Sequence, residues 1–271
     1  MLKNFLITGD THSKVAERLE RIKTFAPEYV PEETGIIILG DAGFNYWLNN
    51  TDKKNKEKSA AFGYTIYCLR GNHEERPENL GYDLETDENV GGLVYADPHC
   101  SNIKYLLDGN IYQINGFKCL AIGGAYSVDK WYRLQRAAMN GQSFSGWFED
   151  EQLNDWEKNA IFNQIKGEHF DFVFTHTAPF SWEPTDLFLS GIDQSHVDKS
   201  MEEWLEEVKN NIYWDTWCFG HYHADRLEMP YVEQYYHNFE SIDNIYKRWS
   251  EYAIGNNEPL KYFAKGPKFI E

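Results

Sequence analysis

Residues 66–76 read Ile-Tyr-Cys-Leu-Arg-Gly-Asn-His-Glu-Glu-Arg, an apolar run followed at once by a polar turn. The apolar run combines β-branched and aromatic residues, which predicts a short buried strand. Gly71-Asn72-His73-Glu74 then places an amide, an imidazole and a carboxylate directly after that strand. Because α/β proteins assemble their sites at strand ends along one edge of a sheet, this turn is a candidate part of a functional site.

The same arrangement recurs elsewhere in the chain. Apolar runs at 5–7, 36–39, 172–174 and 217–219 precede the short motifs Asp10-Thr11-His12, Gly40-Asp41, Thr175-His176 and Gly220-His221-Tyr222-His223. A single motif of this kind is more often ordinary polar packing than a pair of ligands. Their joint occurrence, each behind its own strand, predicts that carboxylate, amide and imidazole groups converge on one point. These ligand types suit manganese, iron or zinc, so the sequence predicts a dinuclear metal site.

The order Asp-x-His, Gly-Asp, Gly-Asn-His-Glu, His and Gly-His-x-His resembles that of the calcineurin-like metallophosphoesterase superfamily. Residues 69–76 are especially similar to the branch that contains the serine/threonine phosphoprotein phosphatases. That branch usually has Asp-Arg-Gly shortly after Gly-Asp, but here Phe44 and Asn45 stand where its Asp and Arg would be. The chain therefore departs from that branch at the residue that orients the motif histidine and at one that holds phosphate.

The resemblance implies a fold, a four-layer α/β/β/α sandwich in which two facing mixed β-sheets are flanked by helices. Periodicity alone indicates only an α/β protein. From the residues we expect strands at 4–9, 36–39, 65–69, 171–175 and 215–219, a hairpin and strand within 105–122, and helices at 14–25, 50–62, 149–165 and 201–210. Residues 77–102 predict a loop with one short strand. We expect a single domain over 1–271, with a possible lid at 126–148 and a C-terminal extension at 224–271.

The resemblance also implies a role for each motif residue. One metal ion would be held by Asp10, His12 and His223, a second by Asn72, His176 and His221, and Asp41 would bridge both. The implied reaction is hydrolysis of a phosphomonoester by direct attack of metal-bound hydroxide. His73 would protonate or stabilise the leaving oxygen, since an imidazole exchanges protons near neutral pH; the alternative is that it only supports its turn. Its orienting partner is left open among Glu74, Asn45 and water.

Two pairs of residues are candidates for substrate binding. Arg70 and Arg76 flank the Gly-Asn-His-Glu turn, and a guanidinium can bind phosphate bidentately, although either can equally pair with nearby acids. Trp131 and Arg133 belong to the possible lid, which follows Gly123-Gly124. They predict either a wall of the substrate site or ordinary surface packing.

Composition limits the classes of function. The chain has 271 residues and is 42% hydrophobic, enough apolar material for a large core. Its 43 acidic and 26 basic residues give a net charge of −17, so no nucleic-acid partner is expected. No apolar run approaches about 18 residues, so no membrane association is expected and a cytoplasmic location follows by default. None of the four cysteines has an arginine six positions later, which argues against a cysteine-nucleophile phosphatase.

Several functions remain open after these limits. A metal-dependent phosphatase acting on a phosphorylated small molecule or a phosphoprotein leads. A phosphodiesterase or nucleotide pyrophosphohydrolase is the nearest alternative, because the same metals serve both reactions. A non-catalytic, metal-bound scaffold that binds a partner protein is the alternative of a different class, and the full ligand set together with His73 argues against it.

Overall fold

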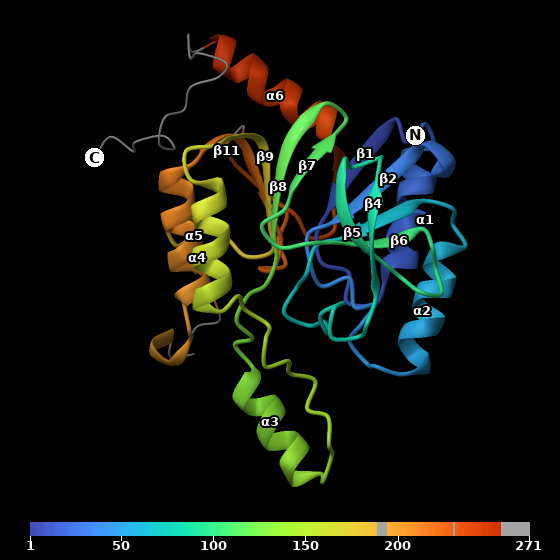
Figure 1. Ribbon diagram of the computed structural model, residues 1–271, viewed down its shortest axis with the longest axis vertical. Helices are drawn as coiled ribbons and strands as arrows, with labels where there is room; N and C mark the ends of the chain where they lie inside the picture. The colour runs from blue at the N-terminus through green and yellow to red at the C-terminus, as the bar shows by residue number, and fades with distance from the viewer. Residues whose placement is uncertain (189–193, 230, 256–271) are drawn as a thin grey trace.

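The computed structural model describes residues 1–188, 194–229 and 231–255 (Figure 1). Two β-sheets face each other at the centre, and helices cover their outer faces. This is the four-layer α/β/β/α sandwich that the resemblance implied, so the predicted fold class is confirmed. No helix in the described residues is long and apolar enough to cross a membrane.

The first sheet has seven strands in the order β13-β1-β2-β3-β6-β5-β4. Its central strands run parallel and are β1 (Asn4–Thr8), β2 (Thr34–Ile38), β3 (Thr65–Cys68) and β6 (Ile103–Leu106). Its antiparallel strands are β4 (Asp83–Asp87), β5 (Gly92–Ala96) and β13 (Phe239–Ser241). Because β1, β2 and β3 run in one direction, the turns that follow them meet at one edge of the sheet.

The second sheet has six strands in the order β11-β12-β10-β9-β8-β7. Its parallel strands are β8 (Phe117–Ile122), β9 (His169–Thr175), β10 (Tyr213–Phe219) and β12 (Val232–Gln234). Its antiparallel strands are β7 (Ile111–Ile114) and β11 (Arg226–Met229). The hairpin expected within 105–122 turns at Asn115-Gly116 between β7 and β8, and both residues have positive φ, as a tight hairpin requires.

Alternating side chains of the central strands divide the core into layers. On β2, Ile37 packs between the sheets with Phe172 and Phe174, whereas Ile36 packs outward, in the cluster that contains Leu19 of the first helix. Helices α1 (Val15–Phe25) and α2 (Asn50–Ala60) cover the first sheet, and α4 (Asp155–Ile165) and α5 (Ser200–Asn211) cover the second (Figure 1). Short 3₁₀ turns occupy Pro31–Glu33, Phe180–Trp182, Thr185–Leu187 and Gln194–His196.

One helix stands apart from the layers. Helix α3 (Lys130–Met139) lies within the possible lid and projects away from the body of the molecule (Figure 1). Its side chains are mostly exposed, and Trp131 is 66% exposed.

The structure corrects three expectations about secondary structure. Residues 77–102 contain two strands, because β4 pairs with β5 and β5 continues the sheet beside β6. The helix expected from residue 149 begins at Asp155, where Asn154 and Glu157 form a reciprocal capping box. Beyond His223, where we expected a C-terminal extension and no particular strand or helix, three strands complete the two sheets and α6 (Ile242–Gly255) follows.

Candidate metal centre

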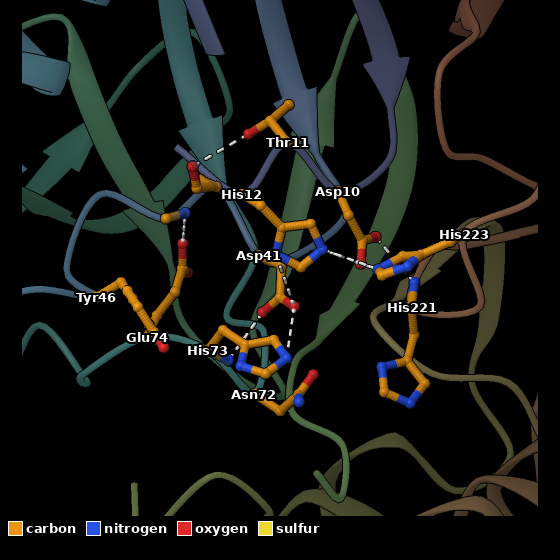
Figure 2. A network of polar contacts seen from close by, with 12 residues as sticks. Asp10, Thr11, His12, Asp41, Tyr46, Asn72, His73, Glu74, His221 and His223 are labelled. Carbon is orange, nitrogen blue, oxygen red and sulfur yellow. Dashed lines mark hydrogen bonds and ion pairs between the residues drawn. The ribbon is translucent and has the colours of Figure 1, made fainter. Parts of the chain in front are cut away.

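The side chains of the predicted metal site converge at the edge where both sheets end. Asp10, Asp41 and Asn72 follow β1, β2 and β3 of the first sheet. His176 follows β9, and His221 and His223 follow β10, in the second sheet. Figure 2 shows His12, Asp10 and His223 directed toward one another, with Asp41 and Asn72 beside them.

A first group of ligands consists of Asp10, His12 and His223. Their metal-binding atoms all lie within 4.8 Å of one another. The Nε2 atoms of His12 and His223 are 2.8 Å apart, and Asp10 Oδ2 is 3.4 Å from His223 Nε2. Asp10 Oδ2 is buried and has no hydrogen-bond partner in the described part of the chain. This group is the predicted ligand set of the first metal ion.

A second group of ligands surrounds His176. Asn72 Oδ1 lies 2.9 Å from His176 Nε2, and the ring centroids of His176 and His221 are 5.0 Å apart. The backbone carbonyl of Leu39 accepts a hydrogen bond from His176 Nδ1 at 2.7 Å, and Ser127 Oγ accepts one from Asn72 Nδ2 at 2.8 Å. In a neutral His176 the Nε2 lone pair therefore faces the amide oxygen of Asn72.

Asp41 lies between the two groups. Its Oδ2 is 3.8 Å from His12 Nδ1, and its Oδ1 is 3.8 Å from His176 Nε2. Burial alone would raise the pKa of Asp41, but the surrounding imidazoles, His73 first, outweigh it and hold that pKa well below its usual range. The residue is therefore an ionised carboxylate that reaches toward both groups.

The donor set fits a pair of cations. In the second group a histidine lone pair faces a buried amide oxygen, and in the first group the Nε2 atoms of His12 and His223 lie beside the buried, unpartnered Asp10 Oδ2, so a positive charge would stabilise both arrangements. Burial also lowers the pKa of His12 and lowers that of His221 to about 3, so both rings are neutral near pH 7 and can offer a lone pair. The two buried aspartates supply the negative charge that divalent ions need.

The glycines of the motifs make this convergence possible. A Cβ at Gly71 would lie 2.0 Å from Asp41 Oδ1, and a Cβ at Gly40 would lie 2.1 Å from His176 Nδ1. Gly40 also has a φ of +93°, which favours glycine. Glycine therefore precedes a ligand because a ligand that follows another strand comes too close for any side chain.

Backbone strain is concentrated at the same edge. Among the described residues, the non-glycine positions with positive φ include His12, Asp41, His221 and His223. Each such conformation costs about 1–3 kcal/mol and is retained where the surrounding structure or a function requires it. Four candidate ligands thus share a conformation that side chains rarely adopt.

Comparison with known proteins agrees with this geometry. The sequence profile of the calcineurin-like phosphoesterase family matches residues 3–225. The chain belongs to this family. No curated protein matches the chain. A solved crystal structure covers 90% of this chain and 96% of its own, with 11% sequence identity and a TM-score of 0.47.

In this calcineurin-like phosphoesterase the ring of His73 has a different neighbour from those considered in the sequence. Its Nε2 lies 3.4 Å from an Nη atom of Arg133 and 3.8 Å from Asp41 Oδ2, and its backbone N–H donates to Asp41 Oδ1. Neither protein candidate for an orienting partner faces the ring. Glu74 accepts a hydrogen bond from the Gly43 backbone, and Asn45 accepts one from Lys56.

The predicted phosphate role of Arg70 and Arg76 is not supported by their positions. Both are buried, and they line a different cavity from the one beside the candidate metal ligands. Arg70 donates to Asp108 at 2.8 Å and to backbone carbonyls, and Arg76 donates to Glu157 at 2.6 Å. The alternative reading, that these arginines pair with acids in an acidic protein, is the one the structure shows.

Trp131 and Arg133 have different surroundings in the structure. A cavity of about 760 Å³ opens beside the metal ligands, and Arg133 is among the residues that line it, whereas Trp131 is not. Arg133 is held by Asp129 at 2.7 Å and by the Gly146 carbonyl at 2.6 Å. The spacing of one helical turn between Asp129 and Arg133 is a sequence signal for their ion pair. No feature of the sequence indicates that Arg133 approaches His73.

Two further residues at the site were missed by the sequence analysis. Ser127 fixes the amide of Asn72, and the hydroxyl of Tyr46 lies 3.2 Å from an Nη atom of Arg133. Ser127 follows β8 as the motifs follow their strands, which is the one signal that could have drawn attention to it. Taken together, the site has two groups of candidate metal ligands, an imidazole beside them and a guanidinium at the wall of a large cavity.

Proposed function

We propose that this calcineurin-like phosphoesterase is a phosphatase with two metal ions that hydrolyses a phosphomonoester of a small molecule. The observation that carries the proposal is the position of Asp41, whose two carboxylate oxygens each lie 3.8 Å from a histidine of a different ligand group. A shared carboxylate is the requirement of a dinuclear centre, whereas a single metal site would need only one of the two groups.

When bound, two divalent cations activate a water near neutral pH and neutralise phosphate oxygens. The protein's own groups complete the site. The Leu39 carbonyl and Ser127 hold His176 and Asn72 in orientation. Arg133 provides a guanidinium for a phosphate oxygen. It would take the role of the arginine that the phosphoprotein phosphatase branch has at the position of Asn45. His73, beside Asp41, protonates or stabilises the leaving oxygen.

Asp41→Asn tests the proposal. We expect the purified wild-type protein to bind up to two manganese, iron or zinc ions per chain and to hydrolyse 4-nitrophenyl phosphate. Asp41→Asn should reduce the occupancy of both sites and abolish hydrolysis, because a neutral bridge cannot offset two cations. Metal analysis and turnover are measured together on Asp41→Asn and on Asp83→Asn, an exposed strand residue that serves as the control.

Full metal content and activity in Asp41→Asn would contradict the proposed centre. Metal binding without hydrolysis of any phosphoester by the wild-type protein would instead favour the non-catalytic scaffold. Bis(4-nitrophenyl) phosphate, assayed beside the monoester, distinguishes the phosphodiesterase alternative.

A further inference from the structure

The cavity beside the metal ligands is far larger than a phosphate group requires. Its volume of about 760 Å³ is within the range of sites for drug-sized molecules, roughly 300–1,000 Å³. Its wall also includes Phe188, Glu202 and Tyr222, whose ring centroid lies 5.0 Å from that of His221. Glu202 lies in the first turn of α5 and is 3% exposed. These residues are available to bind the part of a substrate that carries the phosphate.

Glu202 has one satisfied and one unsatisfied oxygen. Its Oε1 accepts a hydrogen bond from Thr177 Oγ1 at 2.8 Å, and the hydroxyl of Tyr222 lies 2.9 Å from the same Thr177 oxygen. Because the Thr177 proton is used on Glu202, Tyr222 donates to Thr177. Glu202 Oε2 is buried and has no hydrogen-bond partner in the described residues. An oxygen in this state requires a donor, and the neighbouring hydroxyls have none left to give.

The charges around Glu202 indicate which kind of hydrogen-bond donor its Oε2 atom requires. Two oppositely charged pairs in the cavity wall are matched, with Lys199 2.5 Å from Glu183 and Arg133 2.7 Å from Asp129, and Asp198 accepts hydrogen bonds from Gln152 and the Ser200 backbone. No ion pair to Glu202 is found in the described parts of the chain. Burial raises the pKa of Glu202 to about 7, which reflects the cost of an unpaired carboxylate away from water. A cationic partner would offset that cost.

The aromatic wall beside Glu202 also suits a cation. The Lys199 ammonium already lies 4.8 Å from the centroid of the Phe188 ring, and the Tyr222 ring stacks near Phe188 with an interplanar angle of 26°. Aromatic faces attract ammonium groups, more strongly when water is excluded.

We propose that Glu202 and Tyr222 form a binding site for an ammonium group, so that the substrate is a phosphoester whose leaving group carries a protonated amine. The second half of this inference rests on the proposed phosphatase function, whereas the ammonium site itself does not. Glu202 Oε2 accepts a hydrogen bond from the ammonium group, and the phosphate lies at the metal end of the same cavity.

A pair of matched substrates tests the inference. Tyramine phosphate and 4-ethylphenyl phosphate share an aryl leaving group and differ in the ammonium. We expect wild-type kcat/KM to favour tyramine phosphate by about 10–100-fold, the contribution of a hydrogen bond between charged groups. Glu202→Gln should remove most of this preference. Glu203→Gln, which neutralises the adjacent exposed glutamate, should retain it. Equal kcat/KM for the two esters in the wild-type protein would overturn the inference.

Calorimetric binding of tyramine and of 4-ethylphenol separates this inference from the proposed function. Tyramine should bind the wild-type protein and Glu203→Gln, and should bind Glu202→Gln at least tenfold more weakly. That result without hydrolysis of any ester would reject the phosphatase and leave the ammonium site standing. Hydrolysis of both esters with no difference between tyramine and 4-ethylphenol binding would do the reverse. A preference for tyramine that persists in Glu202→Gln would reject the role of this glutamate.

Discussion

The ring of His73 has different neighbours from the side chains of the candidate ligands. The ligands face acceptors or lone pairs, whereas the ring of His73 lies between Asp41 and the Arg133 guanidinium. Phe44, which stands in place of the usual orienting aspartate, is fully buried in the outer core of the first sheet. Its position is therefore used for packing, and Asp41 together with Arg133 of α3 lies beside the ring of His73 instead.

His73→Ala separates chemistry from metal binding. We expect kcat to fall by about 10²–10⁴-fold, as is typical when a general acid is removed, with metal content unchanged. The loss should be smaller for an aryl phosphate than for an alkyl phosphate, because an aryl oxygen needs less protonation to leave. His99→Ala, at an exposed histidine, is the control. An equal loss on both esters would favour a positioning role for His73 over an acid role.

At the scale of secondary structure, the projecting helix α3 brings one of its side chains to the edge that holds the candidate metal ligands. Arg133 reaches the cavity wall and the vicinity of His73, whereas Trp131 is exposed on the same helix. The possible lid therefore contributes one side chain of the predicted pair to the site.

Arg133→Ala should raise KM for phosphomonoesters, because a guanidinium that binds phosphate is lost, with a smaller effect on kcat. Trp131→Ala is the matched control on the same helix and should leave KM unchanged. Both variants need a melting curve as well, since α3 also packs through the bond from Arg133 to the Gly146 carbonyl. A lowered melting temperature with unchanged KM in Arg133→Ala would show that this arginine acts only in structure.

The pairing of β9 with β10 includes a titratable contact far from the metal ligands. His169 Nε2 lies 3.0 Å from Asp215 Oδ1, and the hydrogen bond to Asp215 raises the pKa of His169 although partial burial opposes it. The contact therefore stabilises the fold below pH 6.5 and loses this effect as the pH rises through the higher folded-state value.

His169→Gln should accordingly destabilise the protein more at pH 5.5 than at pH 8.5. The difference in unfolding free energy should stay below about 1 kcal/mol, because the histidine is partly exposed. Denaturant titrations at both pH values, with His99→Gln as the control, measure it. A destabilisation that is larger at pH 8.5 would contradict the ion pair.

At the scale of the whole molecule, the metal ligands connect the two sheets. Asp10, Asp41 and Asn72 come from the first sheet, whereas His176, His221 and His223 come from the second. Ions bound at this edge would hold both sheets together, so we expect metal binding and folding to be linked.

Removal of the metal ions by a chelator should therefore lower the melting temperature of the entire protein. Metal at 100 times its Kd stabilises the folded state by about 2.7 kcal/mol, or about 5–10 °C for a protein near this size. Calorimetry with manganese and with chelator measures the difference. Asp41→Asn should show little of it, and Asp83→Asn should show it in full. Identical melting curves for the wild-type protein under both conditions would contradict linkage through the metal centre.

The local pattern of the sequence indicated an α/β protein and the convergence of the ligands that follow parallel strands, whereas the four layers were implied only by the family resemblance. Ile36 and Ile37 alternate between two cores, and Asp10, Asp41 and Asn72 each follow their own strand. Parallel strands end at one edge whatever the details of packing, so the position of a ligand after its strand was enough to place it.

Only the tertiary structure decided which side chains meet across elements. Arg133 lies beside His73, Arg70 is engaged by Asp108, and Glu202 reaches the cavity from α5. These contacts join residues far apart in the chain, and their partners are chosen by how helices and loops pack. The strands after His223 were missed for a related reason, since β12 and β13 are short and are stabilised by the neighbouring strands β10 and β1. A pattern read along the chain contains the period of an element but not the identity of its neighbours.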